Sequence, residues 1–376
     1  MLFWKEILGF FKFFFKTPRQ ERSIVFYAEH ESYFANFEGL IEVLTCRHGK
    51  TVSYITSDPS DPLLASKNPG IKVFYLSKLL PFFMLLVNSR VFVMTLTDLN
   101  RFYLRRSVNS VHYVYVFHSL VSTHMMYRHG SFDHYDTILC AGPHHVKEIR
   151  EHEATHKLKQ KNLVEAGYYR LERVYQAFRK YSPAQNSTKK GIVLIAPSWG
   201  DRNILESLGE RLIQKLLDEG FEVIVRPHPE TIRRSPALIA ALSAKFDENS
   251  KFALEKSVAT DDSLLKADVL ICDCSGVALE YALGTERPVL FIKAPLKIRN
   301  KRFNETGIPP LEVALRSEIG VLVSPEMVDS IPQAISDLIE KRISYQKRLA
   351  KLREQTVYAF GSSSRIGAKE IIKLAT

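Results

Sequence analysis

The chain lacks the features that would place it in several common classes of protein. Of its 376 residues only four are cysteines, and they are too scattered for a disulfide framework, which fits a reducing cytosol. No G-x-G-x-x-G follows a strand pattern, and no G-x-x-x-x-G-K-[ST] occurs. Dinucleotide-dependent dehydrogenases and P-loop nucleotidases, which depend on these motifs, therefore lose most of their support.

Apolar runs long enough to cross a membrane are also lacking. Residues 1–16 and 79–87 are the most apolar stretches, and both fall short of the roughly 20 residues that a spanning helix needs. No small-residue cleavage site follows the first stretch, so it does not fit a signal peptide. For residues 79–87, a buried helix is favoured over a membrane contact.

Positive charge is what the chain has in excess. The formal net charge is +11 and the isoelectric point is about 9.3, while 45% of the residues are hydrophobic, as in a globular protein. This excess indicates an anionic partner: nucleic acid, a phospholipid surface or a phosphorylated substrate. Composition alone does not choose among the three.

Residues 1–17 are predicted to form an amphipathic helix at a membrane interface. On a helical wheel the three lysines fall on one side, with Gly9 between them. The other side is apolar and aromatic, which is typical of a helix that lies in the interface. It consists of Phe3, Trp4, Ile7, Leu8, Phe10, Phe11, Phe14 and Phe15. Leu2 and Phe13 do not fit this pattern, and the alternative is a helix docked on the protein's own core.

Apolar strand patterns then alternate with helical patterns in two successive runs. The strand patterns are SIVFYA, TVSYITS, IKVFYL, VFVMTL, VHYVYVF and DTILCAG, then GIVLIAP, FEVIV, residues 251–254, ADVLIC and PVLFI. Such alternation indicates parallel sheets covered by helices on both faces. The polar segment 180–190 between the runs is the best interdomain linker.

We therefore predict an α/β protein of two Rossmann-like domains that face a cleft. The predicted N-terminal domain covers 22–179, and the predicted C-terminal domain covers 188–345. A charged helical segment, 346–376, follows. Ligands in such sheets bind beyond the carboxyl ends of the strands.

The C-terminal run holds a motif suited to phosphate. Ser275 and Gly276 lie where a helix begins, and unpaired backbone N–H groups and the helix dipole favour an anion there. Gly276 lets the backbone approach a ligand closely. Glu280, one turn further, could accept hydrogen bonds from a ribose or a polyol. The alternative is an ordinary serine N-cap.

Two further motifs follow strands of the same run. In R-P-H-P, residues 226–229, Arg226 suits a phosphate group, and His228 between two prolines can donate a proton near neutral pH. In P-S-W, Ser198 and Trp199 end a strand on the same side. The alternatives are a structural loop for the first motif and packing of Trp199 for the second.

Histidine is concentrated between His118 and His156, which hold eight of the twelve. His118 directly follows the apolar strand 111–117, where a general base would face the cleft. His152 and His156 match H-E-x-x-H, a zinc-binding spacing. The flanks are charged and no third ligand is evident downstream, so we interpret the match as chance and predict neither a metal site nor a cofactor.

The ordered set of motifs resembles the CDP-glycerol glycerophosphotransferases, the teichoic-acid primases and polymerases, which are peripheral membrane enzymes of GT-B architecture. The shared order is a histidine at a strand end, G-Y-x-R, A-P-[ST]-W, R-P-H-P, and D-x-S-[SG] before an acidic residue, over roughly residues 110–295. The resemblance implies that the domain of 22–179 binds the acceptor, that the domain of 188–345 binds the nucleotide donor, and that His118 and His228 are catalytic. The donor-binding positions it implies are Arg170, Ser198, Arg226, Ser275, Gly276 and Glu280.

The chain departs from the family pattern at three places. The His-Gly of the family is His118-Ser119, the proline of G-Y-P-R is Tyr169, and T-W-R becomes S-W-G unless Arg202 takes the place of the arginine. These departures leave the donor open among CDP-glycerol, CDP-ribitol and another nucleotide-linked polyol or sugar.

The resemblance implies transfer of glycerol phosphate, or a related polyol phosphate, from a CDP-linked donor to a lipid-linked glycan in cell-surface polymer synthesis. The enzyme is then expected at the cytoplasmic face of the membrane. The alternative is a GT-B nucleotide-sugar glycosyltransferase in surface polysaccharide synthesis. No nucleic-acid-binding signature or clustered basic helix is found, so no nucleic-acid partner is expected.

Overall fold

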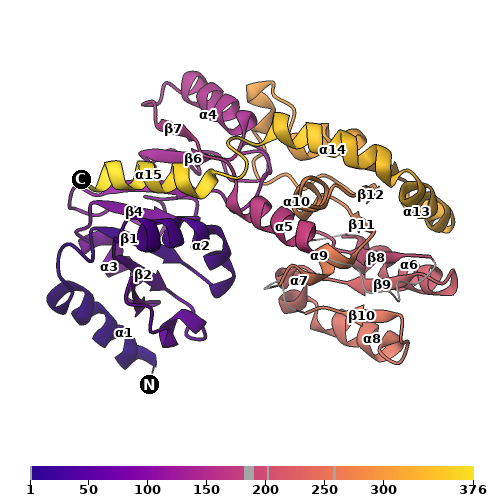
Figure 1. Cartoon of the computed structure of the whole chain (residues 1–376), viewed down its shortest axis with the longest axis horizontal. Coiled ribbons are helices and arrows are strands. Elements are labelled where there is room, and N and C mark those ends of the chain that lie inside the picture. The colour runs from indigo at the N-terminus through magenta and orange to yellow at the C-terminus, as the bar shows by residue number, and fades with distance from the viewer. Residues whose placement is uncertain (1, 182–189, 201–202, 257–259) are drawn as a thin grey trace.

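The computed structural model describes residues 2–181, 190–200, 203–256 and 260–376. Two parallel sheets lie side by side, each flanked by helices (Figure 1). The first is seven-stranded, in the order β3-β2-β1-β4-β5-β6-β7. Its strands are β1 Ile24–Ala28, β2 Val52–Thr56, β3 Ile71–Tyr75, β4 Val91–Met94, β5 His112–Val116, β6 Thr137–Cys140 and β7 Asn162–Glu165. We call this sheet and its helices the N-terminal domain.

The second sheet is six-stranded, in the order β10-β9-β8-β11-β12-β13. Its strands are β8 Ile192–Ile195, β9 Glu222–Val225, β10 Phe252–Leu254, β11 Val269–Cys272, β12 Val289–Ile292 and β13 Gly320–Val323. Both sheets therefore run outward from a central first strand in two directions, as in Rossmann folds. This confirms the predicted architecture. Strands β7 and β13, the last of each sheet, were not among the predicted strands.

The strands are nearly continuous apolar runs because helices cover both faces of each sheet. In the N-terminal domain one face is packed by α1, α3 and α4, and the other by α2 and α15. Its helices are α1 Leu2–Phe11, α2 Phe34–Glu42, α3 Leu80–Leu86, α4 Pro143–Thr155 and α5 Tyr169–Lys180, with shorter turns η1 Lys12–Lys16, η2 Glu31–Tyr33, η3 Val43–Arg47 and η4 Pro62–Ala65.

The C-terminal domain is built around one large apolar core. Its helices are α6 Ile204–Asp218, α7 Pro229–Arg234, α8 Pro236–Phe246, α9 Asp262–Lys266, α10 Val277–Thr285, α11 Leu311–Ala314, α12 Arg316–Ile319 and α13 Ile331–Glu340, with η5 Phe303–Thr306 and η6 Pro325–Ser330. The final helices, α14 Arg342–Thr356 and α15 Ser363–Ala375, confirm that the end of the chain is helical. Figure 1 shows α14 along the C-terminal domain and α15 back over the N-terminal one.

Helix α1 docks on the domain through a face that the helical wheel did not select. Glu6 is buried, and its carboxylate accepts the backbone N–H groups of Ser77 and Leu79 at 3.0 and 2.9 Å. Gly9 passes against the backbone of Tyr75, and Phe13, which the wheel left out, is fully buried. Because these three residues make the contact, the apolar side remains largely outward.

The segment 79–87 is only half buried, contrary to the favoured interpretation. Leu80, Phe83 and Met84 of α3 face the core, where Phe83 contacts the rings of α1 and η1. Phe82, in contrast, is 62% exposed, and its helical neighbours Leu85 and Leu86 are exposed too. A short helix at a domain surface can bury only one face. In the described part of the chain, no helix has both the length and the apolarity to cross a bilayer.

The predicted interdomain linker, 180–190, lies mostly outside the described residues. On either side of it, α5 ends at Lys180 and β8 begins at Ile192. All four cysteines are free, three of them buried.

Candidate functional site

Two strand ends meet at the point where the strand order of the C-terminal sheet reverses. Strands β8 and β11 are neighbours, and the backbone N–H of Ser198, after β8, donates to the buried carboxylate of Asp273, after β11, at 2.8 Å. The same oxygen accepts the N–H of Cys274. Asp273 therefore fixes the turn that leads into α10, at the position where such sheets bind ligands.

The start of α10 lies against the N-terminal domain. Ser275 precedes the helix and Gly276 occupies its N-cap position, without a side-chain cap. The serine cap that was the alternative interpretation is therefore not formed. A Cβ on Gly276 would lie 2.6 Å from Oγ of Ser119, so the absence of a side chain at Gly276 allows this close approach. The residue after His118 thus contacts the predicted phosphate-binding turn.

His118 lies just beyond β5, among aromatic side chains. Its ring is 5.7 Å from that of Tyr33 and 6.0 Å from that of Tyr127, both edge-on. Burial lowers the pKa of His118 to about 4, and the nearby Arg170 guanidinium adds to this effect. The imidazole is therefore neutral near pH 7 and can accept a proton.

His228 is held by the first turn of α7. Its Nδ1 accepts the backbone N–H of Glu230 at 3.1 Å, which makes it the N-cap of that helix. Burial, and then the charge of Lys297, lowers its pKa to about 4. The neutral ring with Nδ1 as acceptor carries its hydrogen on Nε2. His228 is thus a neutral hydrogen-bond donor, in contrast to the predicted proton donor.

The guanidinium of Arg226 is largely engaged by protein groups. It is 5% exposed and donates to Ser263 Oγ at 3.1 Å and to the carbonyl of Thr260 at 2.9 Å. A carboxylate oxygen of Glu255 lies 3.9 Å from its Nε. These contacts orient the loop before α9, and they leave Arg226 as a buried positive charge beside the strand ends.

Glu280 joins the two domains. Its two carboxylate oxygens accept the hydroxyl of Tyr168 at 2.7 Å and Nε of Arg170 at 2.9 Å, both from the G-Y-x-R motif. Gly167 makes the turn before them, with a φ of +91°. The backbone carbonyl of Tyr358 lies too close to leave room for a Cβ there. Asp261 lies 3.5 Å from Arg170 as well. Arg170 and Glu280, both predicted to bind the donor, therefore already have hydrogen-bond partners within the protein.

A cluster of cations around Trp199 was not predicted from the sequence. Nζ of Lys297 lies 3.6 Å from the centre of the indole, and the guanidinium carbons of Arg234 and Arg299 lie 4.6 and 6.0 Å from it. The ring of His228 is 6.0 Å away. Burial, and then Arg299, lowers the pKa of Lys297 to about 8. The basic run after β12 was the signal that could have revealed it.

These strand ends give one neutral histidine on the N-terminal side and a set of cations on the C-terminal side. Two Rossmann-like domains whose carboxyl edges face each other are the arrangement of the GT-B fold. The profile of CDP-glycerol:poly(glycerophosphate) glycerophosphotransferases matches residues 9–302, and the chain belongs to this family. It is therefore a transferase of the CDP-glycerol glycerophosphotransferase type.

Solved structures show the same fold. The wall teichoic acid polymerase TagF is 13% identical, with a TM-score of 0.61 over 100% of this chain and 97% of its own. A TagF variant soaked with CDPG is 14% identical to this chain, with a TM-score of 0.58. The UDP-GlcNAc 2-epimerase from Neisseria meningitidis, bound to UDP-GlcNAc, is 12% identical. Its TM-score is 0.56 over 93% of this chain and 99% of its own. No curated protein is significantly similar in sequence.

Proposed function

We propose that the chain transfers glycerol phosphate from CDP-glycerol to a hydroxyl of a lipid-linked glycan at the membrane surface. Membership of the glycerophosphotransferase family supports the donor, and TagF, which has the same fold, was soaked with CDPG. The observation that carries the proposal is the contact of the His118–Ser119 turn with the start of α10. It puts a neutral base beside a helix N-terminus suited to phosphate.

In the proposed reaction His118 takes the proton of the acceptor hydroxyl. The freed oxygen attacks the phosphorus that carries glycerol, and the bond from this phosphorus to the bridging oxygen of the pyrophosphate breaks. CMP leaves with the bonding electron pair. The backbone N–H groups at 275–276 hold the donor phosphates, while His228 donates through Nε2 and Lys297 supplies positive charge to the leaving group.

The glycan acceptor is proposed to reach this site from a bilayer on which the N-terminal domain rests. Large apolar side chains of α1, η1 and α3 point outward, and ring contacts between Phe83 and Phe10, Phe13 and Phe14 hold these elements together. The exposed ones are Leu2, Phe3, Trp4, Leu8, Phe11, Phe15, Phe82, Leu85 and Leu86. We call them the apolar face. Such a face with exposed lysines beside it suits an anionic membrane surface, which supports a peripheral, cytoplasmic-face location.

The donor is tested by CMP release from purified protein given CDP-glycerol and a detergent-solubilised lipid acceptor. We expect CMP from the wild type, at least a hundredfold less from His228→Ala, and unchanged release from His48→Ala, which alters an exposed histidine elsewhere. If CMP never appears and a nucleotide sugar instead yields a nucleoside diphosphate, the glycosyltransferase alternative replaces this proposal.

The membrane contact is tested by co-sedimentation with phosphatidylglycerol vesicles. The double variant Trp4→Glu, Phe15→Glu removes two side chains that are 68% and 76% exposed. We expect binding to weaken at least tenfold. The matched control, Ile343→Glu, alters a side chain of α14 that is 64% exposed. Equal loss in both variants, or no loss in the double variant, contradicts the membrane contact.

A further inference from the structure

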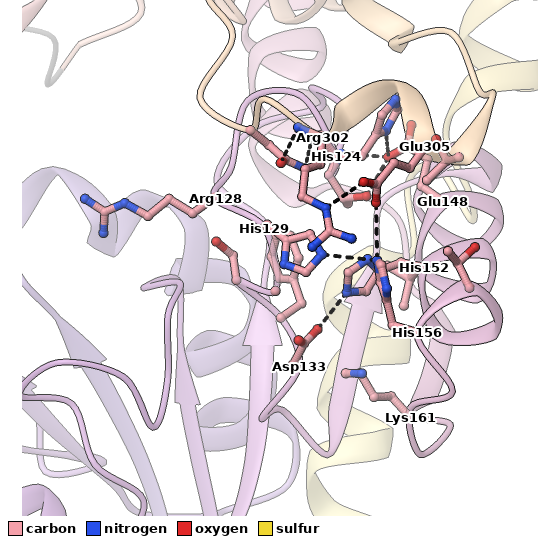
Figure 2. A pocket seen from close by; sticks show the side chains of 18 residues that line it. His124, Arg128, His129, Asp133, Glu148, His152, His156, Lys161, Arg302 and Glu305 are labelled. Atoms are coloured by element: carbon pink, nitrogen blue, oxygen red, sulfur yellow. Dashed lines mark hydrogen bonds and ion pairs between the residues drawn. The ribbon is translucent and has the colours of Figure 1, made fainter.

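A second group of ionisable side chains lies apart from the strand ends, between α4 and the segment 299–306 (Figure 2). His129, His152 and His156 meet there, and one ring nitrogen of each lies within 4.8 Å of the other two. Figure 2 shows the three rings converging, with Asp133 on one side and Glu305 on the other. None of these residues belongs to the proposed transferase site.

The three histidines come from two parts of the N-terminal domain. His152 and His156 are four residues apart at the end of α4, so their side chains share one helical face. His129 comes from the connection between β5 and β6, and its ring lies 5.1 and 4.8 Å from those of the other two. The third partner of the H-E-x-x-H pair, His129, therefore lies upstream of it in the sequence and not downstream.

The histidines are arranged as acceptors rather than as charged groups. Nε2 of His129 lies 3.1 Å from Nε2 of His156, so at least one of the two atoms carries a lone pair and no hydrogen. Asp133 Oδ1 lies 3.0 Å from Nε2 of His152, the carboxylate contact that commonly orients a metal-binding imidazole.

We propose that His129, His152 and His156 bind one divalent transition-metal ion of the Zn²⁺ class, with Glu305 as the fourth ligand. Tetrahedral zinc sites place neighbouring ligand nitrogens about 3.3 Å apart. The observed separations of up to 4.8 Å therefore need to shorten by at most about 1.5 Å, through rotation of the side chains. Glu305 Oε2 lies 3.8 Å from Nε2 of His156, while Arg302 holds the other oxygen at 2.6 Å. Two carboxylates, Asp133 and Glu305, thus border the three imidazoles.

The pattern does not make a peptidase site. In zinc peptidases the glutamate of H-E-x-x-H faces the metal as a general base. Here Glu153 is buried, and its oxygens are engaged by Arg150 at 2.5 Å and by Nζ of Lys161 at 3.3 Å. The proposed ion is therefore structural. Because Glu305 belongs to η5 of the C-terminal domain, the ion joins that domain to α4.

Other contacts show that this segment already docks on the N-terminal domain. The amide of Asn300 donates to the carbonyl of His124, and Nε2 of His124 lies 2.9 Å from the carbonyl of Ile308. Further along, Glu312 accepts the N–H and hydroxyl of Ser122 at 2.8 and 2.9 Å. The ion thus adds a cross-link to an existing interdomain contact.

The test is titration of the full, metal-stripped chain with Zn²⁺ in competition with a chelator, and with Co²⁺ followed by visible absorption. We expect one ion per chain and the intense absorption bands of tetrahedral Co²⁺. His152→Ala and His129→Ala should each weaken Zn²⁺ binding at least a hundredfold, and Glu305→Gln and Asp133→Asn about tenfold. The control, His48→Ala, should bind as the wild type does.

Circular dichroism checks that each variant is folded, and His156→Gln provides a second variant that keeps a polar side chain of similar length. If the wild type takes up no ion at one per chain, or if the folded His152→Ala and His156→Gln bind Zn²⁺ as tightly as the wild type, the site does not exist. If Glu305→Gln binds unchanged, the interdomain link is wrong. CMP release is measured separately, so these outcomes do not depend on the transferase proposal.

Discussion

The two domains share a strand order but differ in what their carboxyl edges present. The N-terminal edge offers His118, a neutral imidazole among Tyr33 and Tyr127. The C-terminal edge offers cations: Lys297 with its arginine neighbours around Trp199. In both domains the strand order reverses at the first strand, so the same kind of carboxyl edge is available for binding. The residues that follow the strands decide that one edge carries a base and the other an anion site.

Desolvation has opposite consequences at the two edges. Burial keeps His118 uncharged, which is what a proton acceptor needs. At the other edge, burial lowers the pKa of Lys297 to about 8 and so disfavours the positive charge that an anion site needs. Four predictions follow from this contrast or from the contact that joins the edges.

The largest effect is expected at the base. His118→Ala should lower kcat for CMP release about a thousandfold, because it removes the proposed general base. Binding of CDP-glycerol should change less than threefold, since donor contacts lie on the other domain. Comparison of kcat with the dissociation constant measured by calorimetry separates the two. A variant that loses donor binding to the same extent would assign His118 to the donor edge.

The tie between the edges should carry stability. Glu280→Ala leaves the buried Arg170 and Tyr168 without their acceptor and should lower the free energy of unfolding by about 3 kcal/mol. Glu280→Gln keeps an acceptor and should cost about half as much. The measurement is the urea midpoint, with Glu340→Ala, on the C-terminal turn of α13, as the control. Equal midpoints for Glu280→Ala and the wild type would show that the pair contributes nothing.

The anion edge should titrate and the base should not. Near pH 8 Lys297 loses its proton, so kcat/KM for CDP-glycerol should fall up to about tenfold from pH 7 to pH 9. His118 and His228 have pKa values near 4 and stay neutral over this range. Lys297→Arg should remove the decline because its charge persists. A decline that is unchanged in this variant would point to another group.

The smallest effect concerns the close approach of the two edges. Gly276→Ala places a methyl group against Ser119 Oγ and should lower activity about threefold, equivalent to less than 1 kcal/mol. Ser119→Gly should be near the wild type, and the double variant should recover activity because space is restored. Rates of CMP release for the four proteins form a cycle. Strict additivity of the two changes would show that the edges do not touch.

The architecture was predictable because each predicted strand is a continuous apolar run between turn residues. Strand β13 was not predicted because its four residues, GVLV, are only partly covered and follow two one-turn helices. The strand-end motifs were placed correctly for the same local reason: R-P-H-P and Ser275–Gly276 follow apolar strands directly.

The partners of the site residues were not predictable, because they come from distant parts of the chain. Glu280 is satisfied by Tyr168 and Arg170, more than a hundred residues earlier. Phe13 breaks the wheel of the first helix because a short π-helical turn, η1, directs it into the core. Periodicity describes one regular helix and carries no information on either kind of contact.

The return of α15 to the first domain has a consequence for synthesis on the ribosome. Ala368 and Ile371 complete the apolar layer against which α2 packs, so one face of the first sheet stays partly uncovered until residues 363–375 have emerged. The domain that begins first therefore finishes last, after the second domain has formed. Nascent chains halted before α15 should accordingly need a chaperone at that face.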